Sequence, residues 1–234
     1  MWLAGEGGSV LPAQAPLPYF GGKARIAGEV WRRFGNVANL IDPFFGSGAV
    51  LFGRPHRAAE RGIETVNDVD GLLDNFWRAV QAAPEAVADA ADFPVSECSL
   101  HARHLWLVGQ RERITGRLMA DPEWYDAKAA GWWLWGICQW IGSGWCAGDG
   151  PWTAERFLAE DGIKAESGAA LPVDTGDAGT GIHRKRPHLG DAGRGIHRKL
   201  PHLGNAGTER LTATAYTAHL RAFMAALAER LRGV

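Results

Sequence analysis

This 234-residue sequence has few cysteines, little net charge and no apolar run near its N-terminus. The three cysteines form no even disulfide set and show no metal-ligand spacing, which argues against a disulfide framework and favours a reducing cytoplasm. A formal net charge of −1 excludes a global field that would hold nucleic acid, so such binding requires a local basic patch. The N-terminus has no basic segment followed by an apolar run and predicts no signal peptide.

Residues 129–147 carry no charge over about the span of a membrane. They also contain Gln139, Ser143 and interior glycines, and their tryptophans are spread throughout rather than gathered at the ends. We therefore expect a buried, aromatic-rich helix and turn here, with a transmembrane helix as the less favoured alternative. The tryptophans of this block are more typical of a core than of a base-stacking surface.

The first part of the chain predicts an α/β fold. Residues 1–16 read as a flexible tail, and a helical pattern begins at Lys23. Residues 36–45 form a short apolar run that predicts a buried strand, and residues 63–68 predict a second strand. A helical pattern follows over 69–80. Strand, Gly-rich loop, helix and strand form a βαβ unit, whose strands are parallel.

Beyond residue 95 the pattern becomes mainly helical. Residues 96–120 predict a helix, and Asp121 and Pro122 suggest the cap and first residue of the next one. Residues 161–207 are rich in glycine and contain a repeat of period 14, with the copies at 181–193 and 195–207. Two polar copies are too few for a solenoid, so we expect a long, partly disordered loop. Residues 208–234 predict an amphipathic helix.

The segment DPFFGSGAV (42–50) places glycines between the first strand and a helix. Glycine there lets the backbone approach a ligand and leaves N–H groups available for a carboxylate or phosphate. Asp68, at the end of the second strand, has the position of an acid that binds ribose hydroxyls. Together they predict a site for a nucleoside with an anionic tail. The alternative is a glycine turn with a surface aspartate.

Three segments, PYFGGK (18–23), DPFFGSGAVLF (42–52) and NDVDGLLDNFWRAV (67–80), occur in this order. They resemble the Dam-like (D12 class) N6-adenine-specific DNA methyltransferases. The resemblance implies transfer of a methyl group from S-adenosyl-L-methionine to adenine N6 in double-stranded DNA. It also implies a cytoplasmic protein of a prokaryotic or phage restriction-modification type, with no membrane partner.

The resemblance further implies a Rossmann-like S-adenosylmethionine-dependent methyltransferase core, here with an incomplete parallel sheet, and a mainly helical recognition insertion. Residues 17–95 would be the cofactor-binding half and 96–207 the target-recognition insertion, with a basic Gly-rich loop at 161–207. Residues 208–234 would form a helix returning to the core.

Residues that match the family's cofactor motifs can be carried over one by one. Tyr19 matches an aromatic residue near the cofactor, Lys23 a charge partner for the methionine carboxylate, and Asp68 the ribose-binding acid. The full predicted cofactor-binding set is Tyr19, Phe20, Gly22, Lys23, Asp42, Phe44, Gly46, Ser47, Gly48, Asp68 and Val69.

The repeat loop holds the cations that we expect to contact DNA phosphates. These residues are Arg184, Lys185, Arg186, Arg194, Arg198 and Lys199. A solvated low-complexity insertion is the alternative. A zinc site built from the four histidines of the loop is less favoured, because no carboxylate or cysteine supports it, and we predict no metal.

No D-P-P-Y motif, which forms the catalytic strand in the family, occurs in the sequence. The segment 42–45 is superficially similar, but the glycines after it indicate the cofactor loop. The catalytic residues are therefore unknown, and the chain looks truncated before that strand. The alternatives are an inactive DNA- or S-adenosylmethionine-binding remnant, one half of a split enzyme with a second chain supplying the strand, and a different nucleotide-using Rossmann-type enzyme.

Overall fold

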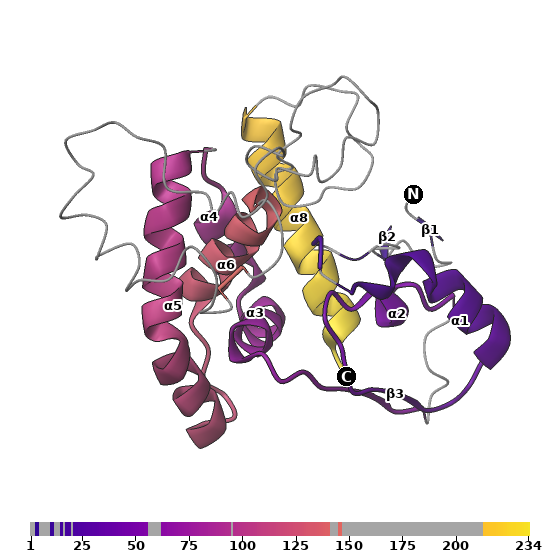
Figure 1. Ribbon diagram of the computed structural model, residues 1–234. Helices are drawn as coiled ribbons and strands as arrows, with labels where there is room; N and C mark the ends of the chain where they lie inside the picture. Colours follow the sequence, from indigo (N-terminus) through magenta and orange to yellow (C-terminus); the bar gives the residue numbers. More distant parts are fainter. Residues whose placement is uncertain are drawn as a thin grey trace, which may run out of the picture.

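The computed structural model describes residues 3–4, 10–11, 15, 17–19, 21–55, 62–94, 96–140, 145–146 and 213–234. Its elements, in chain order, are β1 (Leu3–Ala4), β2 (Val10–Leu11), the 3-10 helix η1 (Lys23–Arg25), α1 (Ala27–Phe34), β3 (Leu40–Asp42), α2 (Ala49–Phe52), β4 (Glu64–Val66), α3 (Gly71–Ala82), α4 (Pro84–Ala91), α5 (Glu97–Ala120), α6 (Ala127–Gln139) and α8 (Ala213–Leu231). Figure 1 shows α1, α2 and β3 on one side of the molecule, α4 to α6 on the other, and α8 between them.

The predicted βαβ unit is confirmed, in a small form. β3 and β4 pair in parallel, with Leu40 opposite Glu64 and Asp42 opposite Val66. Each strand has three residues and is shorter than its apolar segment. Pro43 follows β3 directly and has no N–H to continue the ladder. Ile41, in the centre of β3, is 74% exposed, so the described residues leave one face of this parallel sheet uncovered.

Residues 1–16, expected as a flexible tail, contain the antiparallel pair of β1 and β2. β2 contacts α8, which brings the two ends of the described chain together. α4 is a second element that the sequence patterns did not predict. It begins with Pro84, a residue favoured in the first turn of a helix.

The prediction that Asp121 caps a helix is wrong. The N–H of Asp121 bonds to the carbonyl of Arg117 and closes α5, and the residues after it form a turn. α6 begins six residues later, where the Asp126 side chain accepts a hydrogen bond from the N–H of Ala129. Asn75 of α3 bonds to both the N–H and the carbonyl of Asp126, which selects this cap over Asp121.

The described part of the tryptophan-rich segment packs into the core, as predicted, with Trp132 and Trp140 only partly buried. α6 contacts α3, α4 and α5, and its Trp133 and Trp135 are almost completely buried. Among the described residues, no helix is long and apolar enough to cross a membrane. The predicted C-terminal amphipathic helix is confirmed as α8, which contacts α3 and α4 through its apolar face. The buried residues of that face are Leu220, Phe223, Met224, Leu227 and Leu231.

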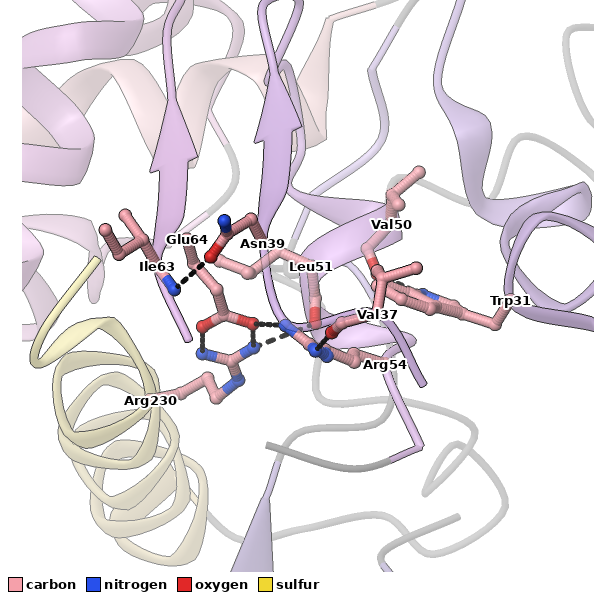
Figure 2. Close-up of polar contacts among 9 residues, drawn as sticks. All are labelled: Trp31, Val37, Asn39, Val50, Leu51, Arg54, Ile63, Glu64 and Arg230. Carbon is pink, nitrogen blue, oxygen red and sulfur yellow. Dashed lines mark hydrogen bonds and ion pairs between the residues drawn. The ribbon is translucent and has the colours of Figure 1, made fainter. Parts of the chain in front are cut away.

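A buried carboxylate joins α8 to the sheet. Glu64 of β4 lies between two arginines, Arg230 of α8 and Arg54, which follows α2 (Figure 2). Arg230 makes two bonds to the carboxylate, at 2.7 and 2.8 Å, and Arg54 makes one at 2.8 Å. The side chains are 7%, 6% and 1% exposed for Glu64, Arg230 and Arg54. The C-terminal helix is therefore fixed to β4, the strand that leads to Asp68.

Candidate functional site

A cleft of about 260 Å³ lies at the carboxyl ends of β3 and β4. Its lining residues are Tyr19, Gly21, Gly22, Lys23, Phe44, Phe45, Gly46, Ser47 and Asp68. Ligands of open α/β sheets bind outside the carboxyl ends of the strands, so this is the expected place for a site. The volume is slightly below the ~300–1,000 Å³ of typical ligand pockets, which fits part of a nucleoside-sized molecule.

The Gly-rich loop adopts a backbone that only glycine tolerates well. Gly46 and Gly48 have φ values of 54° and 71°, in the left-handed region. A Cβ atom on Gly48 would lie 2.3 Å from a ring carbon of Phe52. A Cβ atom on Gly46 would lie 3.0 Å from the ring of Tyr19. The glycines thus permit both a tight turn and the close packing of aromatic rings around it.

Asp68 and the Gly-rich loop meet directly. One carboxylate oxygen of Asp68 accepts a hydrogen bond of 2.8 Å from the N–H of Gly46. The other oxygen accepts from the N–H groups of Val69, at 2.8 Å, and Asp70, at 3.2 Å. A carboxylate has about four acceptor positions, so Asp68 can accept one further bond from a ligand. The structure therefore brings together the two features that the sequence placed at one site.

Lys23 is held by the protein itself. Its Nζ donates to the Asp42 carboxylate at 2.6 Å and to the carbonyl of Phe44 at 2.5 Å. An ammonium group has three N–H donors, so one remains for a ligand. The second carboxylate oxygen of Asp42 is buried and has no partner among the described residues. Lys23 thus combines a bond to the loop backbone with a position on the wall of the cleft.

Tyr19 lines the cleft, and its ring lies so close to Gly46 that a Cβ atom there would come within 3.0 Å of it. Burial, together with the negative charges of Asp68 and Asp70, raises the pKa of Tyr19 to about 12. Its phenol is therefore protonated at neutral pH and presents an uncharged hydroxyl and an aromatic face to the cleft. These properties suit contact with an apolar or cationic group rather than proton abstraction.

The other predicted cofactor residues have diverse positions. Gly22 and Ser47 line the cleft, and Phe44 lines it while being 78% exposed. Asp42 lies behind Lys23, and Val69 is 97% exposed. Phe20 and the six predicted DNA-binding residues of the loop, Arg184, Lys185, Arg186, Arg194, Arg198 and Lys199, lie outside the described residues.

Motif matching missed residues that shape the cleft. Phe45 lines it, and the indole N–H of Trp77 donates to the carbonyl of Gly46 at 3.0 Å. Phe45 stands inside the quoted loop motif, whereas nothing in the helical pattern of 69–80 distinguishes Trp77 from a core residue. Within the described ranges, no group of three or more His, Cys, Asp or Glu side chains could hold a metal ion.

Comparison with known proteins gives one match. Residues 19–97 match the family model of the D12 class N6 adenine-specific DNA methyltransferase. The matched region covers about a third of the chain, from Tyr19 through α3 and α4, and contains every described residue of the cleft. No curated protein and no solved structure matches the chain.

Proposed function

We propose that the chain binds S-adenosyl-L-methionine in the cleft and serves methylation of adenine N6 in double-stranded DNA, because residues 19–97 match the model of the D12 class methyltransferase family. The contact between Asp68 and Gly46 carries this proposal. In this contact, a carboxylate that can accept a hydrogen bond from a ribose hydroxyl lies beside a glycine turn. Both lie at the carboxyl ends of the strands, which is where open α/β sheets bind nucleotides.

The chemistry of the lining residues fits the cofactor. Asp68 has acceptor capacity left for a ribose hydroxyl, and Lys23 has one N–H left for the carboxylate of the methionine part. The ring faces of Tyr19 and Phe44 suit a sulfonium group, which aromatic rings attract as they attract other cations. When bound, S-adenosyl-L-methionine supplies the reactive methyl group. The residues of the cleft bind and orient it.

Binding of DNA and turnover are separate parts of the proposal. The six cations of the repeat loop (184–199) are the proposed phosphate contacts. The family implies transfer to adenine N6, and the sequence contains no D-P-P-Y motif to hold the base. A second candidate function is a protein that binds S-adenosylmethionine or DNA without turnover. A second chain that supplies a catalytic strand is a separate hypothesis. A restriction-modification or phage role is likewise proposed only from the family.

Calorimetry with S-adenosyl-L-methionine tests the proposed cofactor site. Losing a hydrogen bond to a charged group costs about 1.5–3 kcal/mol, so Asp68→Ala is expected to raise the Kd roughly 10- to 100-fold. Asp89→Ala is the matched control, because Asp89 is half exposed and paired with Arg221, away from the cleft. Equal affinity of the Asp68→Ala variant and the wild type would show that the assignment is wrong.

Two further measurements separate the alternatives. Transfer of tritium from labelled S-adenosyl-L-methionine to unmethylated duplex DNA indicates an enzyme, whereas cofactor binding without transfer indicates a non-catalytic protein. A thermal shift with NAD but none with S-adenosyl-L-methionine would instead indicate a different nucleotide-using enzyme.

A further inference from the structure

The backbone at Gly46 is held on both sides of its Cα atom. The N–H of Gly46 donates to Asp68, at the end of β4, at 2.8 Å. Its carbonyl accepts the indole N–H of Trp77, on α3, at 3.0 Å. The two peptide groups that flank this Cα are therefore tied to two different elements. Because φ and ψ are the only soft torsions of a residue, these two bonds together restrain the conformation at Gly46.

Trp77 is itself firmly placed. It is 7% exposed, and its ring contacts those of Phe45, Phe52 and Phe76, with centroid distances of 5.0, 5.6 and 4.7 Å. It lies two turns along α3 from the capping residue Asp70, whose side chain accepts a bond from the N–H of Leu72. The donor is therefore a side chain that packing against three aromatic rings holds in place.

Tryptophan suits this place for a chemical reason. Phenylalanine would fill only part of the space and has no donor, so the carbonyl of Gly46 would be left without this buried partner. An unsatisfied buried polar group is costly, which makes the indole N–H the specific contribution of tryptophan. Packing alone would account for an aromatic ring at this position and would not require the N–H.

We propose that Trp77 is a positioning residue for the cleft: its indole N–H keeps the Gly46 turn in the shape that binds the cofactor. This inference rests on the proposed function for the identity of the ligand, S-adenosyl-L-methionine. The effect of Trp77 on the loop does not depend on that ligand. A binding-competent state that is only partly populated weakens apparent affinity in proportion, so loosening the turn raises the Kd.

The test compares Trp77→Phe with Trp135→Phe, using the whole chain. The control removes an equivalent bond, because the indole N–H of Trp135 donates to the carbonyl of Phe93 at 2.8 Å, far from the cleft in sequence. In the ligand-free protein, we expect hydrogen exchange of residues 44–48 to become about 3- to 10-fold faster in Trp77→Phe. Trp135→Phe is expected to leave that segment at the wild-type rate.

Calorimetry with S-adenosyl-L-methionine supplies the second measurement. Trp77→Phe is expected to raise the Kd about 3- to 10-fold, and Trp135→Phe less than 2-fold. Unchanged exchange of residues 44–48 would overturn the inference, and so would faster exchange with an unchanged Kd. If the wild type itself bound no S-adenosyl-L-methionine, the proposed function would fail, while the exchange comparison would still decide the role of Trp77.

A measurement on the wild type keeps the inference testable if the Trp77→Phe variant does not fold. Hydrogen exchange in increasing, sub-denaturing urea reports which segments open together. We expect residues 44–48 to lose protection at the same urea concentration as α3. Loss of protection at 44–48 well before α3 would show that α3 does not hold the loop.

Discussion

Glu64→Gln is expected to be among the most destabilising single changes in this protein. The variant keeps the size of the side chain and removes the carboxylate that, among the described residues, pairs with both Arg54 and Arg230, which are nearly inaccessible to solvent. Three charge-assisted bonds, between 2.7 and 2.8 Å, are weakened at once. Breaking a buried ion pair by removing one partner costs about 3–5 kcal/mol, since the remaining charge stays buried. Here two arginines would remain, so we expect a loss of at least about 3 kcal/mol.

Urea denaturation followed by circular dichroism measures this loss of stability, and the loss is expected to depend on pH. Although burial by itself raises the pKa of Glu64, bonds to Arg230 and Arg54 outweigh burial and hold that pKa below its ordinary value. A depressed pKa stabilises the fold above the unfolded pKa of about 4.3, and this stabilisation is lost as the pH falls through the folded pKa. The difference between wild type and Glu64→Gln should therefore be full at pH 7 and shrink in acid.

The matched control is Glu29→Gln on α1. Glu29 also contacts two arginines, Arg32 and Arg33, at 2.7 Å, but all three side chains are between 45% and 73% exposed. Exposed pairs of this kind contribute little, so this variant should unfold at the wild-type urea concentration. Equal midpoints for the two variants, or a Glu64→Gln effect that does not depend on pH, would refute the reasoning from burial.

The glycine loop and the cysteines give two further predictions. Gly48→Ala should lower the free energy of unfolding, measured by urea denaturation, by at least about 2 kcal/mol, because it combines a positive φ with a Cβ atom 2.3 Å from Phe52. Gly28→Ala is the control. It has open space around it and should be neutral or stabilise the protein by about 0.4–1 kcal/mol. A thiol reagent should modify Cys98 in the native protein and reach Cys138 and Cys146 only in denaturant, since these two are buried. Rapid native reaction of all three would contradict the packing around α6.

Local sequence patterns predict much of the fold. The βαβ unit was predictable because glycine, a closing proline and β-branched residues occur within one short stretch, and α8 because its apolar residues repeat at the helical period. The cap of α6 was not predictable, since Asp121 followed by Pro122 has the local pattern of a cap and only Asn75, 51 positions before Asp126, selects Asp126 instead. The pairing of Arg230 with Glu64, over a separation of 166 residues, leaves no trace in local sequence.

The candidate site likewise has features that the sequence predicts and features that it does not. Its residue set was predictable from three motifs, whereas the partners within the set were not. Lys23 was predicted to meet a ligand carboxylate, and the structure shows it bonded to Asp42 and to the backbone of Phe44. Asp68 was predicted to meet ribose, and the structure shows it accepting a bond from the N–H of Gly46. Sequence motifs predict which residues gather at a site, but they do not predict the hydrogen bonds that these residues make to one another.

Those internal bonds determine the charge that a ligand meets. The charge of Lys23 is matched by Asp42, at 2.6 Å, whereas Asp68 has no ion-pair partner among the described residues. The cleft therefore has an excess negative charge, which favours a ligand of net positive charge. S-adenosyl-L-methionine has a carboxylate, an ammonium group and a sulfonium, so it is such a ligand. After loss of the methyl group the sulfonium becomes a neutral thioether. The attraction that favours binding of the proposed cofactor is thus weakened for its product, and this difference favours exchange of product for a new cofactor molecule.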